Sequence, residues 1–368
     1  MHAKDGWKRA LLAHYKGCWK EVVHNLPQLW VAFASDTEDS HPTYVPGWHR
    51  RGSNYDVNPA KLKCDWSRYW CDLSECFKSQ GVPVTWLIRV DDGPMRDFML
   101  DRFRNEILEL KSNGDEVGIH IHSWVWNSKS SKWVQTKDSK CETKIVHRSL
   151  DIFKIKLGFA PLSIRMGWNA MSNEIMRTLD ANGLLVDSSA VPKAFCSGKF
   201  GNRDNIMDWS RTPNIPYHPS YDDYQSPGDM KILEIPISTL EAGKSHAFAR
   251  LVNRFSGIKS SISLVKLLPI ARRLDLNPNS CFYISPSWSL SGVLKIVKAY
   301  HKKAYENGKA FLVGYFHACD ILDPRTGEKN YLFERYLSRI VEEISSFSGM
   351  HVTFITLSEM ARNYDTDK

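Results

Sequence analysis

Short apolar segments with strand character alternate with helical segments from about residue 29 to the end of the chain, and this alternation constrains the fold most strongly. It is typical of βαβ units, in which successive strands run parallel. The expected strands are 29–36, 82–92, 115–124, 162–168, 184–191, 231–238, 281–287 and 310–318. The expected helices are 65–81, 95–114, 144–158, 172–183, 289–308 and 329–346.

Seven or eight such units in 368 residues predict an α/β fold with a parallel (β/α) barrel. An open, doubly wound sheet is the alternative, but no Gly-rich dinucleotide-binding turn follows the first expected strand. Residues 195–230 interrupt the alternation with Pro, Gly, Asp and Tyr, and we expect a long loop insertion there. A basic segment at 241–274 has helical character.

The same pattern suggests the organisation of the chain. We expect one barrel domain over residues 29–361, which contains the insertion. An N-terminal helical extension at 1–28 precedes it, and a short tail at 362–368 follows it.

Composition excludes some classes of function. The net charge is +8, from 49 basic and 41 acidic residues, but the basic residues are dispersed, so we expect no nucleic-acid partner. No segment approaches the roughly 20 apolar residues of a membrane span. The eight Cys form no CxxC pair and the first residues contain no apolar signal segment, which favours the cytoplasm. The oligomeric state is left open.

Polar residues gather at the ends of the expected strands. In a parallel barrel all carboxyl ends meet at one face, where catalytic groups lie. Each residue alone has an ordinary structural explanation, such as a turn cap, an ion pair or a core histidine. Their recurrence on several strands favours a catalytic site. These residues are Asp36, Glu38, Asp39, Arg89, Asp91, Asp92, His120, His122, Arg165, Trp168, Asp187, His317 and Asp320.

The segment "GDEVGIHIHSW" (114–124) contains two histidines at alternate positions. On a strand His120 and His122 share one face, and Ile119 and Ile121 share the other. Two histidines and one carboxylate are a common ligand set for a catalytic Zn²⁺ with an open position. A second carboxylate nearby could accept a proton from an activated water. The pair could equally be two histidines in a polar pocket, but together these features favour a metal-dependent hydrolase.

Several short motifs, in order and spacing, resemble those of the polysaccharide deacetylases, the carbohydrate esterases with the chitooligosaccharide-deacetylase homology domain. The resemblance covers about residues 29–361 and is carried by motif order more than by any one motif. The motifs are "FASDTEDS" (33–40), "GDEVGIH" (114–120), "SIRMGW" (163–168), "LLVDSSAVP" (184–192), "ILEIPIS" (232–238), "GYFHACD" (314–320) and "TFITLSEMA" (353–361).

The resemblance implies a distorted (β/α) barrel of seven strands that binds a divalent metal ion, and we expect this ion to be zinc. The roles that it implies are Asp36 as general base, Glu38, His120 and His122 as metal ligands, Arg165 as the group that orients the base, and His317 as general acid.

The second motif departs from the family pattern. The family's second histidine comes four residues after the first, where this chain has Trp124, and His122 is the nearby replacement. The residue between Asp36 and Glu38 also leaves open which of Asp36, Glu38 and Asp39 binds the metal.

The resemblance implies hydrolytic removal of an N-acetyl or similar acyl group from a carbohydrate, an amino sugar or a glycan. We expect this step in the biosynthesis of a surface polysaccharide or glycan. Two alternatives remain open: hydrolysis of a non-sugar amide by the same fold, and a catalytically inactive, deacetylase-like protein that binds glycans or acts as a scaffold.

Overall fold

The computed structural model describes residues 26–37, 66–91, 98–129, 132–136, 138–197, 206–241, 279–284, 290–317, 321 and 331–366. Several expectations lie outside these residues. They concern the N-terminal extension up to residue 25, the basic segment from residue 242 onward, and Glu38, Asp39, Asp92 and Asp320.

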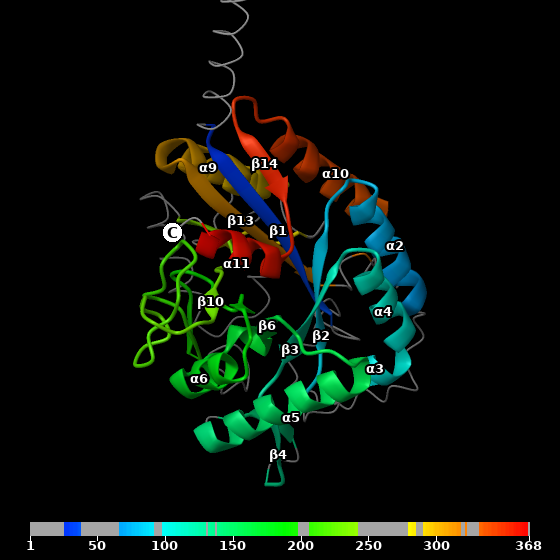
Figure 1. The fold of residues 1–368 in the computed structure, drawn as a ribbon, viewed down its shortest axis with the longest axis vertical. Coiled ribbons are helices and arrows are strands. Elements are labelled where there is room, and N and C mark those ends of the chain that lie inside the picture. Colours follow the sequence, from blue (N-terminus) through cyan, green and yellow to red (C-terminus); the bar gives the residue numbers. More distant parts are fainter. Residues whose placement is uncertain are drawn as a thin grey trace, which may run out of the picture.

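A curled parallel sheet forms the centre of the molecule (Figure 1). Its strands pair in the order β10-β7-β6-β3-β2-β1-β13, and β14 pairs with the first residues of β1. The bounds are β1 (Gln28–Thr37), β2 (Val84–Arg89), β3 (Glu116–Ile121), β6 (Ser163–Met166), β7 (Val186–Asp187), β10 (Leu233–Glu234), β13 (Lys309–His317) and β14 (His351–Phe354).

The two edge strands of this sheet, β10 and β13, approach each other at Ser238, shortly after β10. The Ser238 N–H donates to the Val313 carbonyl at 3.0 Å, and the Ser238 hydroxyl accepts the Val313 N–H at 2.8 Å. This contact brings the curled sheet toward closure. The expected α/β fold, a distorted barrel, is therefore confirmed, and the open doubly wound sheet is wrong. The described sheet has eight strands, because β14 joins the seven strands of the main order.

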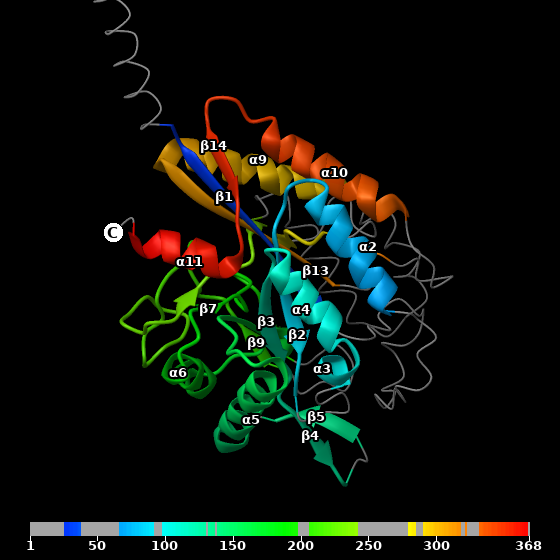
Figure 2. The same cartoon turned by 45° about the vertical axis from the view of Figure 1, so that its right-hand side comes forward.

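Helices cover the outer face of the sheet, as Figure 2 shows. The helix expected at 95–114 is divided at Phe103, whose backbone is not helical. The helices are α2 (Trp66–Lys78), α3 (Phe98–Arg102), α4 (Arg104–Ser112), α5 (Ser139–Leu157), α6 (Asn173–Ala181), α9 (Leu290–Asn307), α10 (Tyr331–Ser345) and α11 (Leu357–Thr366).

Short antiparallel pairs extend from the ends of the barrel strands. They are β4 (Trp124–Asn127) with β5 (Lys132–Gln135), β8 (Phe195–Ser197) with β9 (Ile206–Asp208), and β11 (Thr239–Glu241) with β12 (Asn279–Cys281). Beyond β12, Tyr283 makes a single parallel bridge to Tyr315 of β13 where we expected a strand over 281–287. The described part of the 195–230 insertion is anchored to α6, because Asn173 donates to the Asp222 carbonyl and accepts the Tyr224 N–H.

Alternate side chains along the strands point into two different apolar cores, one on each face of the sheet. On β1, Leu29, Val31 and Phe33 pack against the helices, whereas Trp30, Ala32 and Ala34 face the barrel interior. This period of two is what a strand buried on both faces requires.

Helix α11 closes the amino end of the barrel (Figure 1). Its first backbone N–H groups are satisfied inside the barrel: Leu357 donates to Thr85 Oγ1 at 3.0 Å, and Ser358 to Glu116 Oε2 at 2.9 Å. The helix continues to Thr366, beyond residue 361, where we expected the barrel domain to end. The carboxyl end of the barrel is thus the end left for chemistry. Among the described residues, no helix combines the length and apolar character needed to cross a bilayer.

A buried pair of carboxyl groups lies on the outer face of β7 and β10. Asp187 and Glu234 are register partners and are fully buried. Ser189 donates to Asp187 at 2.6 Å, and the Ala190 N–H to Glu234 at 3.1 Å. Burial, together with the neighbouring charge of Asp187, raises the pKa of Glu234 well above its usual range. Asp187 therefore belongs to this structural pair and does not join the other strand-end residues inside the barrel.

We predict that Glu234→Gln flattens the pH dependence of stability. A carboxyl whose pKa is raised by folding gives its full contribution below its unfolded pKa, and this contribution falls as pH rises toward the folded pKa. Glutamine keeps a donor for Asp187 without titrating. Thermal unfolding measured between about pH 5 and about pH 8 should show a smaller fall in Tm for this variant than for the unmodified protein. Glu306→Gln, at an exposed position on α9, is the control, and parallel curves for all three proteins would refute the prediction.

Candidate active site

Side chains from separate strands converge inside the barrel at its carboxyl end. Asp36 of β1 is the register partner of His317 of β13, and His120 of β3 is the partner of both Arg89 of β2 and Arg165 of β6. Register partners on parallel strands point to the same face. Asp36 alternates with the interior residues of β1, so these side chains share the interior. Four of the site residues predicted from the sequence, Asp36, His120, Arg165 and His317, are thus brought to one end.

Arg165 is fully buried and makes a close ion pair with Asp36. Its Nη1 donates to Asp36 Oδ1 at 2.7 Å, its Nε to the Ser188 carbonyl at 2.7 Å, and its Nη2 to Ser188 Oγ at 3.2 Å. The Arg165 guanidinium also lies over the ring of Tyr315, 5.3 Å from its centroid. These contacts leave the guanidinium one orientation.

The environment of Asp36 decides its charge. Burial alone would raise the pKa of this carboxyl, but the charge of Arg165, the electrostatic interactions with His120 and His317, and the hydrogen bond from Arg165 outweigh burial, so the pKa is lowered. Asp36 is therefore ionised at neutral pH and can act only as a hydrogen-bond acceptor until it takes up a proton.

The two histidines of the third strand face each other. His120 Nε2 lies 3.1 Å from His122 Nε2, the rings are nearly perpendicular, and both side chains are buried. His122 comes just after β3, in a tight turn where the Trp124 N–H donates to its carbonyl at 2.9 Å. The extended backbone thus keeps both imidazoles on one side.

The ring of His122 sits in a closely fitted space. Trp124 stacks on it with 5.7 Å between centroids, and the edge of Trp168 meets it at 6.3 Å. Gly167 passes so close that a Cβ there would lie 2.2 Å from His122 Nδ1. Only glycine fits at this position without moving the imidazole.

The histidine pair fits one divalent metal ion. Two nitrogen ligands about 2.0–2.1 Å from a tetrahedral zinc are about 3.3 Å apart, close to the separation seen here. The same separation suits a hydrogen bond between one protonated and one bare nitrogen. Within the described ranges, no group of three or more His, Cys, Asp or Glu side chains could hold an ion, and Glu38, the predicted third ligand, lies outside them.

His317 has a partner that sequence analysis did not identify. The hydroxyl of Tyr283 lies 3.0 Å from His317 Nδ1, and the two rings meet edge to face at 5.6 Å. Asp320, the acidic residue predicted just beyond this strand, lies outside the described residues. Tyr283 reaches the site because its β-bridge to Tyr315 places it beside β13. No local sequence pattern predicts that pairing.

Sequence analysis also missed Ser188, and it named Arg89 and Trp168 without their contacts. Ser188 holds Arg165, and its own hydroxyl donates to the Ile235 carbonyl at 2.8 Å. Arg89, predicted only as a strand-end residue, is buried, and its Nε donates to Asp91 Oδ2 at 2.7 Å. Trp168 and Asn169 both have positive φ, which is unusual for residues other than glycine and marks a constrained turn after β6. The tripeptide Gly-Trp-Asn at 167–169 was the sequence feature from which that turn could have been predicted.

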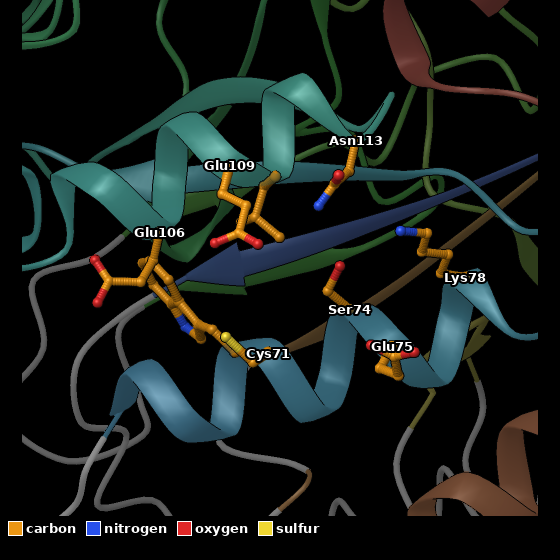
Figure 3. Close-up of a pocket in the computed structure, with 9 residues that line it drawn as sticks. Cys71, Ser74, Glu75, Lys78, Glu106, Glu109 and Asn113 are labelled. Carbon is orange, nitrogen blue, oxygen red and sulfur yellow. The ribbon is translucent and has the colours of Figure 1, made fainter.

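A separate pocket of about 170 Å³ lies between α2 and α4 (Figure 3). Glu75, Glu106, Glu109 and Lys78 are among its lining residues. It belongs to the outer layer of helices and contains none of the predicted site residues, so it is not the candidate active site.

Comparison with solved structures agrees with this architecture. The chain is similar to a "putative polysaccharide deacetylase from Mycobacterium smegmatis", with 15% identity, a TM-score of 0.50, and coverage of 93% of this chain and 91% of that one. It is also similar to a "probable Polysaccharide deacetylase from Pseudomonas aeruginosa PAO1" (13% identity, 93% and 92% covered, TM-score 0.47) and to the allantoinase Puue (13%, 92% and 91%, TM-score 0.48).

No family model matches the sequence, and no curated protein does. At these identities the similarity to solved structures is one of fold. The structure therefore shares its fold with the polysaccharide deacetylase from Mycobacterium smegmatis across most of its length. A shared fold does not fix the chemistry, which depends on the residues of the site.

Proposed function

We propose that the protein is a metal-dependent hydrolase that removes an N-acetyl or similar acyl group from a carbohydrate. One observation carries the proposal: the facing Nε2 atoms of His120 and His122 share the carboxyl end of the barrel with an ionised Asp36 and with His317. Amide hydrolysis needs a deprotonated water, a polarised carbonyl and a protonated leaving nitrogen. This arrangement offers a group for each need.

His120 and His122 would hold the ion, with Glu38 as the third protein ligand implied by the sequence resemblance. Zinc suits this mixed set of imidazole and carboxylate ligands. The bound ion would supply Lewis-acid polarisation of the acyl carbonyl and of a water.

Asp36 is the group that we assign to accept the proton of the attacking water. A carboxylate with a lowered pKa is a weak base. Asp36 would therefore accept a proton more readily from a water whose pKa a metal ion has lowered than from an ordinary water. Arg165 fixes the carboxylate through the 2.7 Å contact to Oδ1, and its other donors are held by Ser188. Arg165 is thus a positioning residue, and it stabilises the charged form of Asp36.

His317 is the group that we assign to protonate the leaving nitrogen. It lies directly across from Asp36 on the neighbouring strand. Tyr283 holds the Nδ1 edge of the ring, so Nε2 is the nitrogen for proton transfer. Base and acid therefore approach the acyl group from adjacent strands.

We predict that His120→Ala and His122→Ala each lower zinc affinity by more than about 100-fold, because each removes one of about three protein ligands. Competition with a chromophoric chelator measures the affinity, and His147→Ala, on an exposed part of α5, is the control. If His122→Ala keeps full metal content, the ligand set is wrong. If the unmodified protein takes up no zinc, manganese, cobalt or nickel, the glycan-binding or scaffold alternative is favoured.

The close approach of Gly167 to His122 gives a second prediction. We expect Gly167→Ala to displace the imidazole, which lowers both stability and zinc affinity, because the new Cβ would overlap the ring. In the His122→Ala background the same substitution should cost much less stability, since the ring is gone. Denaturant unfolding of the single and double variants measures this coupling. Additive losses would show that the contact does not matter.

His317 gives a third prediction, which concerns catalysis alone. We expect His317→Ala to bind zinc normally and to lose about 10²–10⁴-fold in turnover, the usual contribution of a general acid. Tyr283→Phe, which removes only the hydroxyl at Nδ1, should lose less. Acetate release from N-acetylated sugars is the assay. Unchanged turnover in a folded His317→Ala protein would disprove the assignment.

A further inference from the structure

Helix α11 is tied to the 195–230 insertion by two neighbouring residues of its last turn. The Tyr364 hydroxyl donates to the Pro216 carbonyl at 3.0 Å. Asp365 Oδ1 lies 2.9 Å from His218 Nε2. In Figures 1 and 2 the end of α11 marked C lies beside the loops of the insertion. The helix that closes the amino end of the barrel is therefore held at both ends, inside the barrel by its first N–H groups and outside it by this tie.

The imidazole of His218 has an oxygen atom at each of its two nitrogens. Its Nδ1 lies 3.1 Å from the Ile232 carbonyl, just before β10, and its Nε2 faces the Asp365 carboxylate. A carbonyl and a carboxylate accept hydrogen bonds and donate none. A neutral imidazole has one N–H and one bare nitrogen, whereas the protonated ring donates from both nitrogens. Only protonated His218 can therefore satisfy both contacts, and the neutral ring leaves a bare nitrogen facing an oxygen.

In the described part of the chain, the charged and titratable groups around His218 come from α11, from β13 and from the segment before β10. On α11 they are Asp365 and Tyr364, whose ring centroid lies 6.3 Å from that of His218. Lys309 of β13 lies over the Tyr364 ring at 6.0 Å, and Lys231 before β10 is exposed. Burial and, after it, the charge of Asp365 raise the pKa of Tyr364, so its hydroxyl stays protonated across neutral pH. The side chain of His218 is 18% exposed and that of Asp365 44%, so both can exchange protons with solvent.

We propose that Asp365, His218 and Ile232 form a pH-sensitive clasp, which holds the last turn of α11 against the insertion when His218 is protonated. The inference goes beyond the proposed function, because it concerns the amino end of the barrel and not the candidate active site. Histidine is the side chain that ordinarily changes its charge between about pH 5 and about pH 8. Rising pH removes one of the two ring contacts, whereas the Tyr364 contact stays. The last turn of α11 therefore loosens as pH rises, and acid tightens it.

Hydrogen exchange of the whole chain tests the clasp. Peptides from α11 and from α5 are followed at about pH 6 and about pH 8, after correction for the intrinsic pH dependence of amide exchange. Helix α5 is the internal reference, because a change in global stability, such as the one that we expect from Glu234, affects both helices. A change confined to α11 reports the local opening of that helix.

Two variants remove the clasp and two serve as comparisons. His218→Gln has no imidazole to protonate, and Asp365→Asn removes the carboxylate. Tyr364→Phe removes the neighbouring contact, which does not titrate in this range. His351→Gln replaces an exposed histidine on β14 and is the matched control.

We expect α11, relative to α5, to be protected about threefold to fivefold more strongly at about pH 6 than at about pH 8 in the unmodified protein and in His351→Gln. This is the size of effect expected for one partly exposed ion pair. His218→Gln and Asp365→Asn should show no such change and should resemble the unmodified protein at the higher pH. Tyr364→Phe should exchange faster at both pH values and keep the difference between them. The inference is overturned if the relative protection of α11 does not change with pH in the unmodified protein, or if His218→Gln keeps the change.

Discussion

The ion pair between Arg165 and Asp36 is the contact on which the carboxyl end of the barrel depends. The residues that contact Arg165 of β6 come from three other strands: Asp36 from β1, Ser188 from the end of β7 and Tyr315 from β13. The Ser188 hydroxyl in turn donates to the Ile235 carbonyl, just after β10. A guanidinium with no solvent exposure needs a partner for its charge and for its donors. The strands that supply these partners are thereby fixed around the point where His120 and His317 also emerge.

The same ion pair therefore affects both the stability of the barrel and the proposed chemistry. Removing one partner of a buried ion pair typically costs about 3–5 kcal/mol, because the other charge is left uncompensated. A substitution at Asp36 would therefore weaken the barrel as well as remove the proposed base. A loss of activity in such a variant could come from either effect. His317 is partly exposed, and its hydrogen-bond partner is Tyr283, which is not part of this ion pair. A substitution at His317 therefore tests the proposed catalytic role with less effect on folding.

Features that repeat locally could be predicted from the sequence. The alternation of strands and helices led to the barrel, and the strand ends gathered Asp36, His120 and Arg165 at one end of it. The period of two placed His120 and His122 on one face. Contacts between distant segments could not be predicted. Ser238 meets β13 because the sheet curls, and Tyr283 meets His317 because Tyr283 bridges to Tyr315. Asp187 lies outside the site because its side chain is on the outer face, opposite Glu234. The order of residues contains no local trace of such pairings.

The difference at Trp124 from the deacetylase motif that this segment resembles has a geometric explanation. In an extended segment, residues two apart share a face, so a second imidazole at position 122 can meet the first without a helical turn between them. The tight turn after His122 then redirects the chain into the β4–β5 hairpin, and Trp124, at the position where the family has its histidine, packs on the ring of His122 instead. Gly167 leaves the room that this packing requires. The extended segment and the tight turn after it therefore account for both the two-residue spacing of the histidines and the packing of Trp124 on His122.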